Sequence, residues 1–164
     1  MRILGIDPGL GTMGWGVIET DGVKHHLIQY GAILTQPGQP LPQRLRAIFK
    51  GVNQLMETFQ PEDVAFEELF FSKNITTGMA VSAARGVALV AVAQRTDNLY
   101  EYTPMQIKQS VVGYGKADKH QIQQMVKMTL GLPDIIRPDD AADAVAGALT
   151  HFNAGFRKTE FLMK

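Results

Sequence analysis

The sequence predicts an α/β fold in which one five-stranded mixed sheet is flanked by helices. Two observations favour this fold. The first 34 residues contain three strand-like segments separated by short turns, which is typical of an antiparallel meander. From residue 41 onward, helical patterns alternate with two short strand-like segments, as expected when helices connect strands of one sheet. Antiparallel strands followed by alternating helices and strands indicate a mixed sheet.

Composition is that of an ordinary globular protein. At 164 residues the chain can form one domain with a substantial core, and 45% of its residues are hydrophobic against 20% charged. The absence of cysteine excludes a disulfide scaffold and a thiolate metal site. No apolar run approaches a membrane span and no signal-peptide pattern opens the chain, so we expect a cytoplasmic protein without a membrane partner. We assign residues 1–155 to one domain and expect a flexible C-terminal tail at 156–164.

The three N-terminal strands are predicted at 2–7, 13–19 and 23–34. The first is apolar, as expected for a strand covered on both faces, and it ends in Asp7. Pro8-Gly9 then turns the chain, because proline fixes φ and glycine permits a tight reversal. An ionised aspartate at this position lies close to a dry interior. It therefore needs a binding partner, unless it simply caps its own turn.

The remaining elements follow from periodicity and turn residues. A helix is predicted over 41–59 because its apolar residues recur at spacings of four and three: Leu41, Leu45, Ile48, Val52, Leu55 and Phe59. A buried strand at 64–68 ends in Glu67-Glu68, and the weakly charged segment 76–95 is typical of a buried or interface helix. Further on we expect a strand at 99–102 and helices at 104–112, 119–130 and 139–152.

Acidic residues lie at the ends of three predicted elements. They are Asp7, then Glu67 or Glu68, and finally the group Asp139, Asp140 and Asp143. Asp143 lies in an otherwise Ala- and Val-rich run, and no histidine or cysteine is spaced for zinc. Carboxylates alone suit Mg²⁺ or Mn²⁺, and two such ions about 4 Å apart can support phosphodiester hydrolysis. The alternative is that the last acids only cap their helix and complement its dipole.

Basic residues flank these acids although the net charge is zero. Residues 69–137 carry eight Lys and Arg against four Asp and Glu, whereas acids gather at 62–68 and 139–143. An acidic centre with basic flanks is compatible with nucleic-acid binding. Four lysines lie near the predicted site and could contact phosphates: Lys73, Lys108, Lys116 and Lys119.

Several motifs together resemble the RuvC family of Holliday-junction resolvases. They occur in the family's order and spacing from residue 3 to about residue 152. The matching segments are Gly5-Ile6-Asp7-Pro8-Gly9, Gly14-Trp15-Gly16-Val17, Phe66-Glu67-Glu68-Leu69-Phe70 with Lys73-Asn74, Ala84-Arg85-Gly86-Val87, Lys108-Gln109-Ser110-Val111-Val112-Gly113 and Asp140-Ala141-Ala142-Asp143-Ala144. Trp15 replaces the more usual tyrosine, and residues 10–12 and Lys116 also depart from the family pattern.

The resemblance implies a ribonuclease-H-like nuclease domain that resolves four-way (Holliday) DNA junctions by paired symmetric nicks, in recombination and repair. It implies a homodimer, a branch-migration helicase complex (RuvA–RuvB) as partner, and Mg²⁺ as cofactor, with Mn²⁺ able to substitute and two ions per active site. The family's four catalytic and metal-binding acids fall on Asp7, Glu67, Asp140 and Asp143. DNA contacts fall on Lys108 and Lys119, and Phe70 is the residue that could stack on a base at the junction centre.

The segment 76–95 is the predicted dimer contact. Five small or apolar residues recur there at spacings of three and four: Ala80, Ala83, Ala84, Val87 and Ala91. Two nicks of like polarity on a symmetric junction call for two sites related by a dyad.

Three other functions compete with junction resolution. Another ribonuclease-H-like nuclease, cutting RNA–DNA hybrids or acting as a transposase-type strand cutter, would use the same acids. An ATPase of the sugar-kinase or actin type also has an Asp-x-Gly motif after its first strand, but it needs two such domains and far more chain. A catalytically inert DNA-binding module would not require four intact acidic residues.

Overall fold

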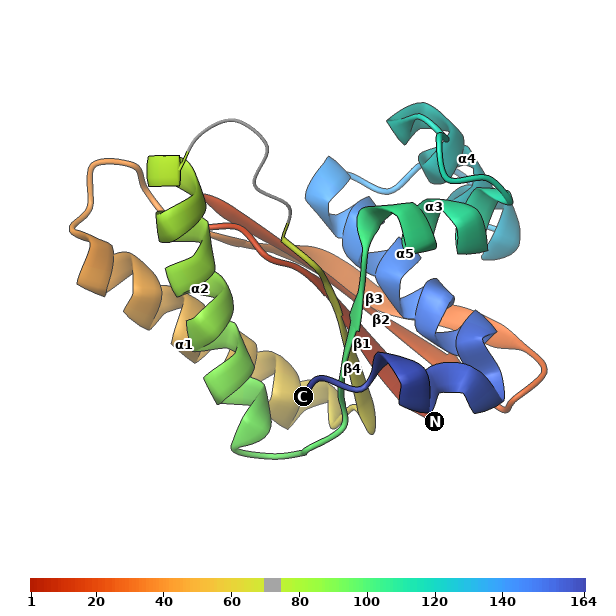
Figure 1. Cartoon of the computed structure of the whole chain (residues 1–164), viewed down its shortest axis with the longest axis horizontal. Coiled ribbons are helices and arrows are strands. Elements are labelled where there is room, and N and C mark those ends of the chain that lie inside the picture. The colour runs from red at the N-terminus through yellow and green to blue at the C-terminus, as the bar shows by residue number, and fades with distance from the viewer. Residues whose placement is uncertain (70–74) are drawn as a thin grey trace.

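The computed structural model describes residues 1–69 and 75–164 and shows a five-stranded sheet between two layers of helices (Figure 1). The strands lie in the order β3-β2-β1-β4-β5. β2 is antiparallel to both β1 and β3, whereas β4 is parallel to β1 and β5 is parallel to β4. The predicted mixed sheet is confirmed. The strand bounds are β1 Arg2–Asp7, β2 Thr12–Thr20, β3 His25–Leu34, β4 Asp63–Glu67 and β5 Leu99–Tyr102.

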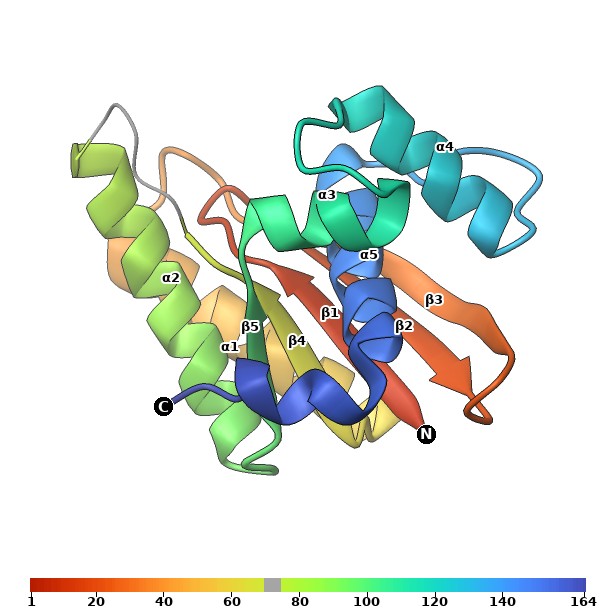
Figure 2. The same ribbon diagram turned by 45° about the vertical axis from the view of Figure 1, so that its right-hand side comes forward.

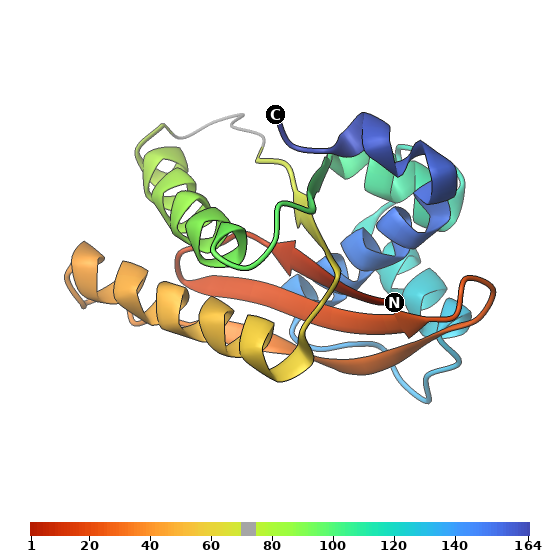
Figure 3. The same ribbon diagram turned by 90° about the horizontal axis from the view of Figure 1, so that it is seen from below.

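Helices cover both faces of the sheet. Figures 1 and 3 show α1 and α2 on one face and α3, α4 and α5 on the other. The bounds are α1 Leu41–Phe59, α2 Ile75–Ala93, α3 Pro104–Val112, α4 Lys119–Thr129 and α5 Asp139–Ala154, followed by the 3₁₀ helix η1 Gly155–Phe161.

Strand alternation divides the core into two clusters. In β1, Leu4 and Ile6 pack toward α1 and α2, whereas Ile3 packs toward α5. Because successive side chains point to opposite faces, Asp7 shares the α5 face with Ile3. This alternation decides which side of the sheet the terminal carboxylate can reach.

Local sequence signals fix the helix ends on that face. Thr103 and Gln106 form a capping box at the start of α3, and Asp118 and Gln121 form another at α4. Each box satisfies backbone N–H groups that have no partner within the first helical turn. The first residues of α3 and α4 are therefore held in place, and α4 begins at Lys119.

Helix α5 lies in direct backbone contact with the sheet, as Figure 2 shows where it crosses β1 and β2. A Cβ atom at Gly5 would lie 1.9 Å from the carbonyl oxygen of Ala144, and one at Gly14 would lie 2.0 Å from that of Asp140. No side chain fits in either place. These glycines set the distance between α5 and the strands.

The C-terminal segment differs from the flexible tail predicted for 156–164. It forms η1 and returns to the sheet, where the backbone of Leu162 bridges Tyr100 and the Met163 N–H donates to the Leu99 carbonyl. Lys158 donates to Asp63 at 2.6 Å. The contacts lie about 60 to 95 residues apart along the chain, so no local periodicity predicts them.

Helix α2 is more apolar than we predicted from the sequence. Residues 76–93 have a mean hydropathy of 1.4, which by length and composition alone would let them cross a membrane, and they form the one such helix in the part of the chain that the structure describes. Core helices of globular proteins pass the same test. Ala84, Ala88 and Ala91 are fully buried in this chain.

Candidate active site

Asp7 and Glu67 lie side by side at the ends of two neighbouring strands. β1 and β4 are parallel with Ile6 opposite Phe66, so the next residue of each strand is one of these two acids. Glu67 shares its face with Ala65, which packs toward α5 as Ile3 does. Glu68 follows the end of β4 and falls on the opposite face. The structure thus brings Glu67, rather than Glu68, to the same side of the sheet as Asp7.

The first turns of α5 supply the other two acids. Asp140 and Asp143 are three residues apart and therefore share one helix face. Gly14 lies opposite Asp7 in the β1–β2 ladder, and it is also the residue whose missing side chain admits the Asp140 backbone. The close approach of α5 to the sheet is what brings its acids to the carboxyl ends of β1 and β4.

Burial and mutual repulsion perturb these carboxyls. Burial raises the pKa of Asp7 to about 8, and the charges of Glu67, Asp143 and Asp140 contribute in the same direction. Burial likewise raises the pKa of Glu67 to about 7, with repulsion from Asp143 second. The pKa of Asp143 is also raised, since its burial outweighs its contact with Lys119. Perturbation of this kind is typical of functional sites.

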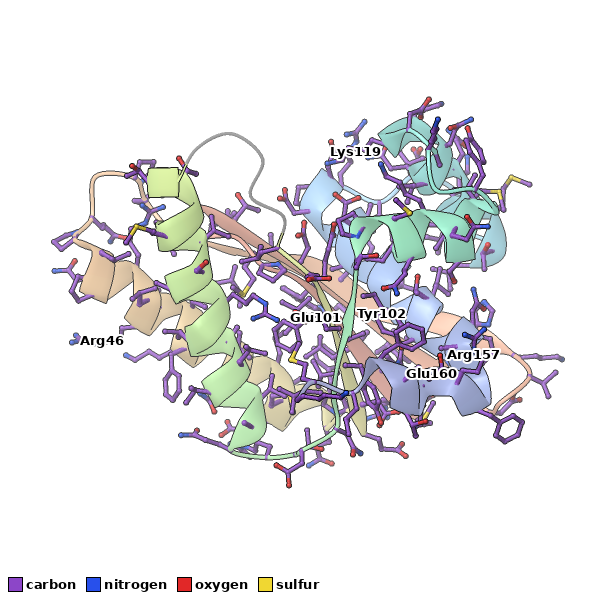
Figure 4. The ribbon with its side chains drawn as sticks, in the orientation of Figure 1. Arg46, Glu101, Tyr102, Lys119, Arg157 and Glu160 are labelled. Carbon is purple, nitrogen blue, oxygen red and sulfur yellow. The ribbon has the colours of Figure 1, made fainter. Side chains whose placement is uncertain are left out.

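A lysine lies within the carboxylate group. Lys119, the first residue of α4, places its Nζ 3.1 Å from Oδ2 of Asp143 and 3.6 Å from Oδ2 of Asp139 (Figure 4). Pairing with Asp143 raises the pKa of Lys119 although burial opposes this. Lys119 also borders a cavity of about 240 Å³ together with Glu67, Lys108 and Asp143.

The donor set has the chemistry of a divalent-cation site. Its four acids supply only carboxylate oxygens, which are the ligands that Mg²⁺ and Mn²⁺ prefer. Burial raises the pKa values of Asp7 and Glu67 because it disfavours their charged forms. A bound cation would act in the opposite direction and favour the ionised carboxylates. Among the residues that the structure describes, no three His, Cys, Asp or Glu side chains converge closely enough to hold a metal ion as they stand. The donors therefore fit the ion by their chemistry.

Comparison with known proteins identifies the family. The sequence model of "Crossover junction endodeoxyribonuclease RuvC" matches residues 3–151. The chain belongs to the RuvC family. A relative of that name from Chloroflexus aggregans is 54% identical over 151 residues, which is 92% of each chain, and one from Alkaliphilus metalliredigens is 49% identical over the full length of both.

Solved structures agree with this assignment. RuvC of T. thermophilus in complex with Holliday junction substrate superposes with a TM-score of 0.89 at 37% identity, covering 98% of this chain and 96% of that one. The yeast mitochondrial Holliday junction resolvase Ydc2 shares the fold with a TM-score of 0.66 at 13% identity, covering 96% and 82%. The ribonuclease-H-like fold implied by the resemblance is thereby confirmed.

The predicted DNA contacts of this RuvC-family chain lie at different places. Lys108 and Lys119 line the cavity beside Glu67, whereas Lys116 is exposed on the loop before α4. Phe70 and Lys73 fall in the segment 70–74, outside the described residues. Their predicted roles therefore remain sequence-based.

The two neighbouring acids that the family pattern does not require have other partners. Glu68 lines a separate cavity of about 260 Å³ with Arg85 and Glu101, which form an ion pair with each other. Asp139 accepts from Gln123 at 2.9 Å and also pairs with Arg137. Asp139 thus helps to hold the start of α5, and Glu68 belongs to the α2 side of the sheet.

Sequence reasoning missed the contribution of the strand glycines to the site. It used Gly5, Gly14 and Gly16 as family markers without assigning them a role. A signal was present, since all three fall on one face of the antiparallel β1–β2 pair, where α5 packs. Three glycines on one face of an otherwise apolar strand pair indicate the close approach of another backbone.

Proposed function

We propose that this RuvC-family chain is an endodeoxyribonuclease that resolves four-way DNA junctions by paired symmetric nicks. The observation that carries the proposal is the pairing of Asp7 with Glu67 on adjacent parallel strand ends, facing the acids of α5. The family match supports it because the match extends from residue 3 to residue 151 and so includes all four acids.

Asp7, Glu67, Asp140 and Asp143 are the proposed catalytic and metal-binding residues, holding two Mg²⁺ ions, with Mn²⁺ able to substitute. The chemistry that such ions would supply when bound is polarisation of a phosphoryl oxygen, activation of an attacking water and stabilisation of the leaving oxygen. The carboxylates hold and space the ions from rigid strand and helix ends. Burial of Asp7 and Glu67 excludes water and strengthens every charge interaction within the site.

Lys108 and Lys119 are the proposed phosphate contacts beside these acids. Both line the cavity that Glu67 borders, so a phosphate held by their ammonium groups lies next to the carboxylates. Lys116 extends the basic surface on the loop before α4. Phosphate contacts position the strand without reading its sequence, and their contribution to affinity falls as salt rises.

The proposed active form is a homodimer that contacts itself through α2. Its solvent side carries Met79 and Val90, which are 70% and 55% exposed. The predicted contact face must be corrected, because Ala84 and Ala91 are buried against this chain's own core. The exposed apolar side of α2 is the part available to a second copy. RuvA–RuvB is the proposed helicase partner and the cytoplasm the proposed compartment.

A cleavage assay on three substrates tests the function. Labelled four-way junction, RNA–DNA hybrid duplex and ATP are each incubated with the protein, with and without Mg²⁺. We expect paired nicks in two opposed strands of the junction only when Mg²⁺ is present. Preferential cutting of the hybrid would instead indicate another ribonuclease-H-like nuclease, and ATP hydrolysis would indicate an ATPase.

A further inference from the structure

Lys119 occupies an unfavourable position in its own helix. It is the first residue of α4, where the aligned peptide dipoles place partial positive charge, and no acid lies in that first turn. The capping box of Asp118 and Gln121 fixes the helix start there. The Asp118 carboxylate supplies one negative charge at this end, and the ammonium group of Lys119 takes further compensation from another element.

That compensation comes from α5. The Lys119 ammonium contacts Asp143 at 3.1 Å and Asp139 at 3.6 Å, across the gap between the two helices. The two partners differ in exposure, since the Asp143 side chain is 22% exposed and that of Lys119 is 52% exposed. The exposed partner can leave toward solvent while the buried one cannot.

Lys119 also acts on three of the four acids, while Lys108 acts on Glu67 as well. The charge of Lys119 acts on Asp7, Glu67 and Asp143, lowering the pKa of each against the effect of burial. Within the described part of the chain, the carboxylates of Asp7 and Glu67 have no hydrogen bond or ion pair. A divalent cation bound to these acids would claim the same Asp143 oxygen that Lys119 now contacts.

We propose that Lys119 is an internal counter-ion of the acid group, competing with a divalent cation for Asp143 and available to DNA phosphate when the cation binds. The inference rests on the proposed metal-dependent function and adds an order to it. Linkage is reciprocal: if the cation frees Lys119 for a phosphate, then phosphate binding must favour the cation by the same factor. Lys119 is here a positioning residue whose partner changes between states.

Metal affinity in the absence of DNA is the first test. Mn²⁺ binding is measured by calorimetry on the full chain, comparing Lys119→Met with Lys127→Met, which removes the same charge from the other end of α4. We expect Lys119→Met to bind Mn²⁺ about fivefold more tightly, the scale of one partly exposed ion pair, and Lys127→Met to be unchanged. Lys119→Gln is a second variant should methionine disturb folding, which unfolding curves check.

Junction affinity gives a second readout that does not depend on cleavage. Binding is followed by fluorescence anisotropy at constant ionic strength, with EDTA or with Ca²⁺ under conditions where no product forms. Lys119→Met should weaken binding severalfold more in Ca²⁺ than in EDTA, because in EDTA the wild-type lysine is held by Asp143. The loss caused by Lys127→Met should be the same in both.

The possible outcomes distinguish a failure of the counter-ion inference from a failure of the proposed nuclease function. Unchanged or weaker Mn²⁺ binding by Lys119→Met, in a protein whose wild type binds Mn²⁺ and cuts junctions, overturns the counter-ion inference and leaves the proposed function intact. An equal increase in Mn²⁺ affinity for Lys127→Met overturns the inference as well, since removal of any positive charge would then explain the increase. A wild type that binds no Mn²⁺ and cuts no junction would overturn both.

Discussion

His151 and Asp63 form a hydrogen bond in the core, with Nε2 of the histidine 2.9 Å from Oδ2 of the carboxylate. Both side chains are almost fully buried, at 1% and 2% exposure. Burial lowers the pKa of His151, which favours the neutral ring, and its other nitrogen lies 2.8 Å from the Tyr102 hydroxyl. Tyr102 donates to Nδ1 and Nε2–H donates to Asp63, which leaves no polar atom of the ring unsatisfied.

Asp63→Asn should destabilise the fold and change its response to acid. Burial raises the Asp63 pKa, but hydrogen bonds from Lys158 and His151 outweigh it, so the folded pKa lies below the ordinary 3.8. A lowered carboxyl pKa stabilises the fold above pH 3.8, and that stability is lost as pH falls through the folded value. The variant should lose about 2 kcal/mol at pH 7.

Urea unfolding between pH 7 and pH 3 measures this effect. The wild-type unfolding free energy should fall more steeply than that of Asp63→Asn at the acid end, so the difference between them narrows. Asp134→Asn is the control, because Asp134 is exposed in the loop between α4 and α5, where it accepts from the backbone N–H of the neighbouring Ile135. Parallel curves for wild type and Asp63→Asn would contradict the assignment.

Asp7→Asn should keep junction binding and lose cleavage. An amide oxygen is a weaker metal ligand than a carboxylate, so stabilisation of the transition state is lost while the phosphate contacts remain. The same variant removes one of several mutually repelling buried acids. In EDTA at pH 8 it should therefore unfold with a free energy about 1 kcal/mol higher than wild type, which denaturant titration measures.

Glu67→Gln and Glu68→Gln form a matched pair that tests the register of β4. Glu67 faces α5 and Glu68 lines the cavity on the α2 side, so Glu67→Gln should reduce the cleavage rate at least about 100-fold and Glu68→Gln should have a milder effect. Single-turnover rates with saturating enzyme separate cleavage from binding. If Glu68→Gln were inactive and Glu67→Gln remained active, the catalytic acid would be Glu68 rather than Glu67.

Gly14→Ala should impair cleavage without altering any acid. The new Cβ would meet the Asp140 carbonyl at 2.0 Å, so α5 must move away from β2 and take Asp140 and Asp143 with it. We expect a rate loss of about 100-fold, as misplacement by roughly 1 Å can produce. Gly147→Ala lies on α5 itself, where an added methyl group would meet no neighbouring atom within 4 Å, and it should cleave normally and be slightly more stable.

Val90→Lys should weaken self-association. A lysine on the exposed side of α2 would place like charges against each other in a two-fold contact, whereas it is easily solvated in a monomer. Sedimentation at micromolar concentration should show the mass shifting toward the 18.0 kDa of one chain. Met128→Lys, at a still more exposed apolar position on α4, should sediment as wild type.

Periodicity predicted the elements whose two faces differ. The bounds of α1 and α3 match the prediction, and α5 begins at Asp139 as its acidic start indicated. Periodicity could not orient α2, because a helix that is apolar nearly all round carries no signal for which side packs on its own core. The predicted face therefore included Ala84 and Ala91, which this chain buries itself.

The site was predictable at the strand ends and not beyond them. A carboxylate after an apolar strand predicted Asp7, but choosing Glu67 over Glu68 from the residues alone required the strand register, since adjacent residues face opposite ways. The contact of Lys119 with Asp143 depends on how α4 docks against α5, which no local pattern encodes. The same holds for His151 and Asp63, which are 88 residues apart.

The backbone bridge between Tyr100 and Leu162 has a consequence for solubility. β5 is the outermost strand of its side of the sheet, and an unpaired outer strand is a template for pairing with another molecule. The final residues occupy that edge, with Met163 also donating to Leu99. These last residues shield β5 from the strand-to-strand pairing that begins aggregation.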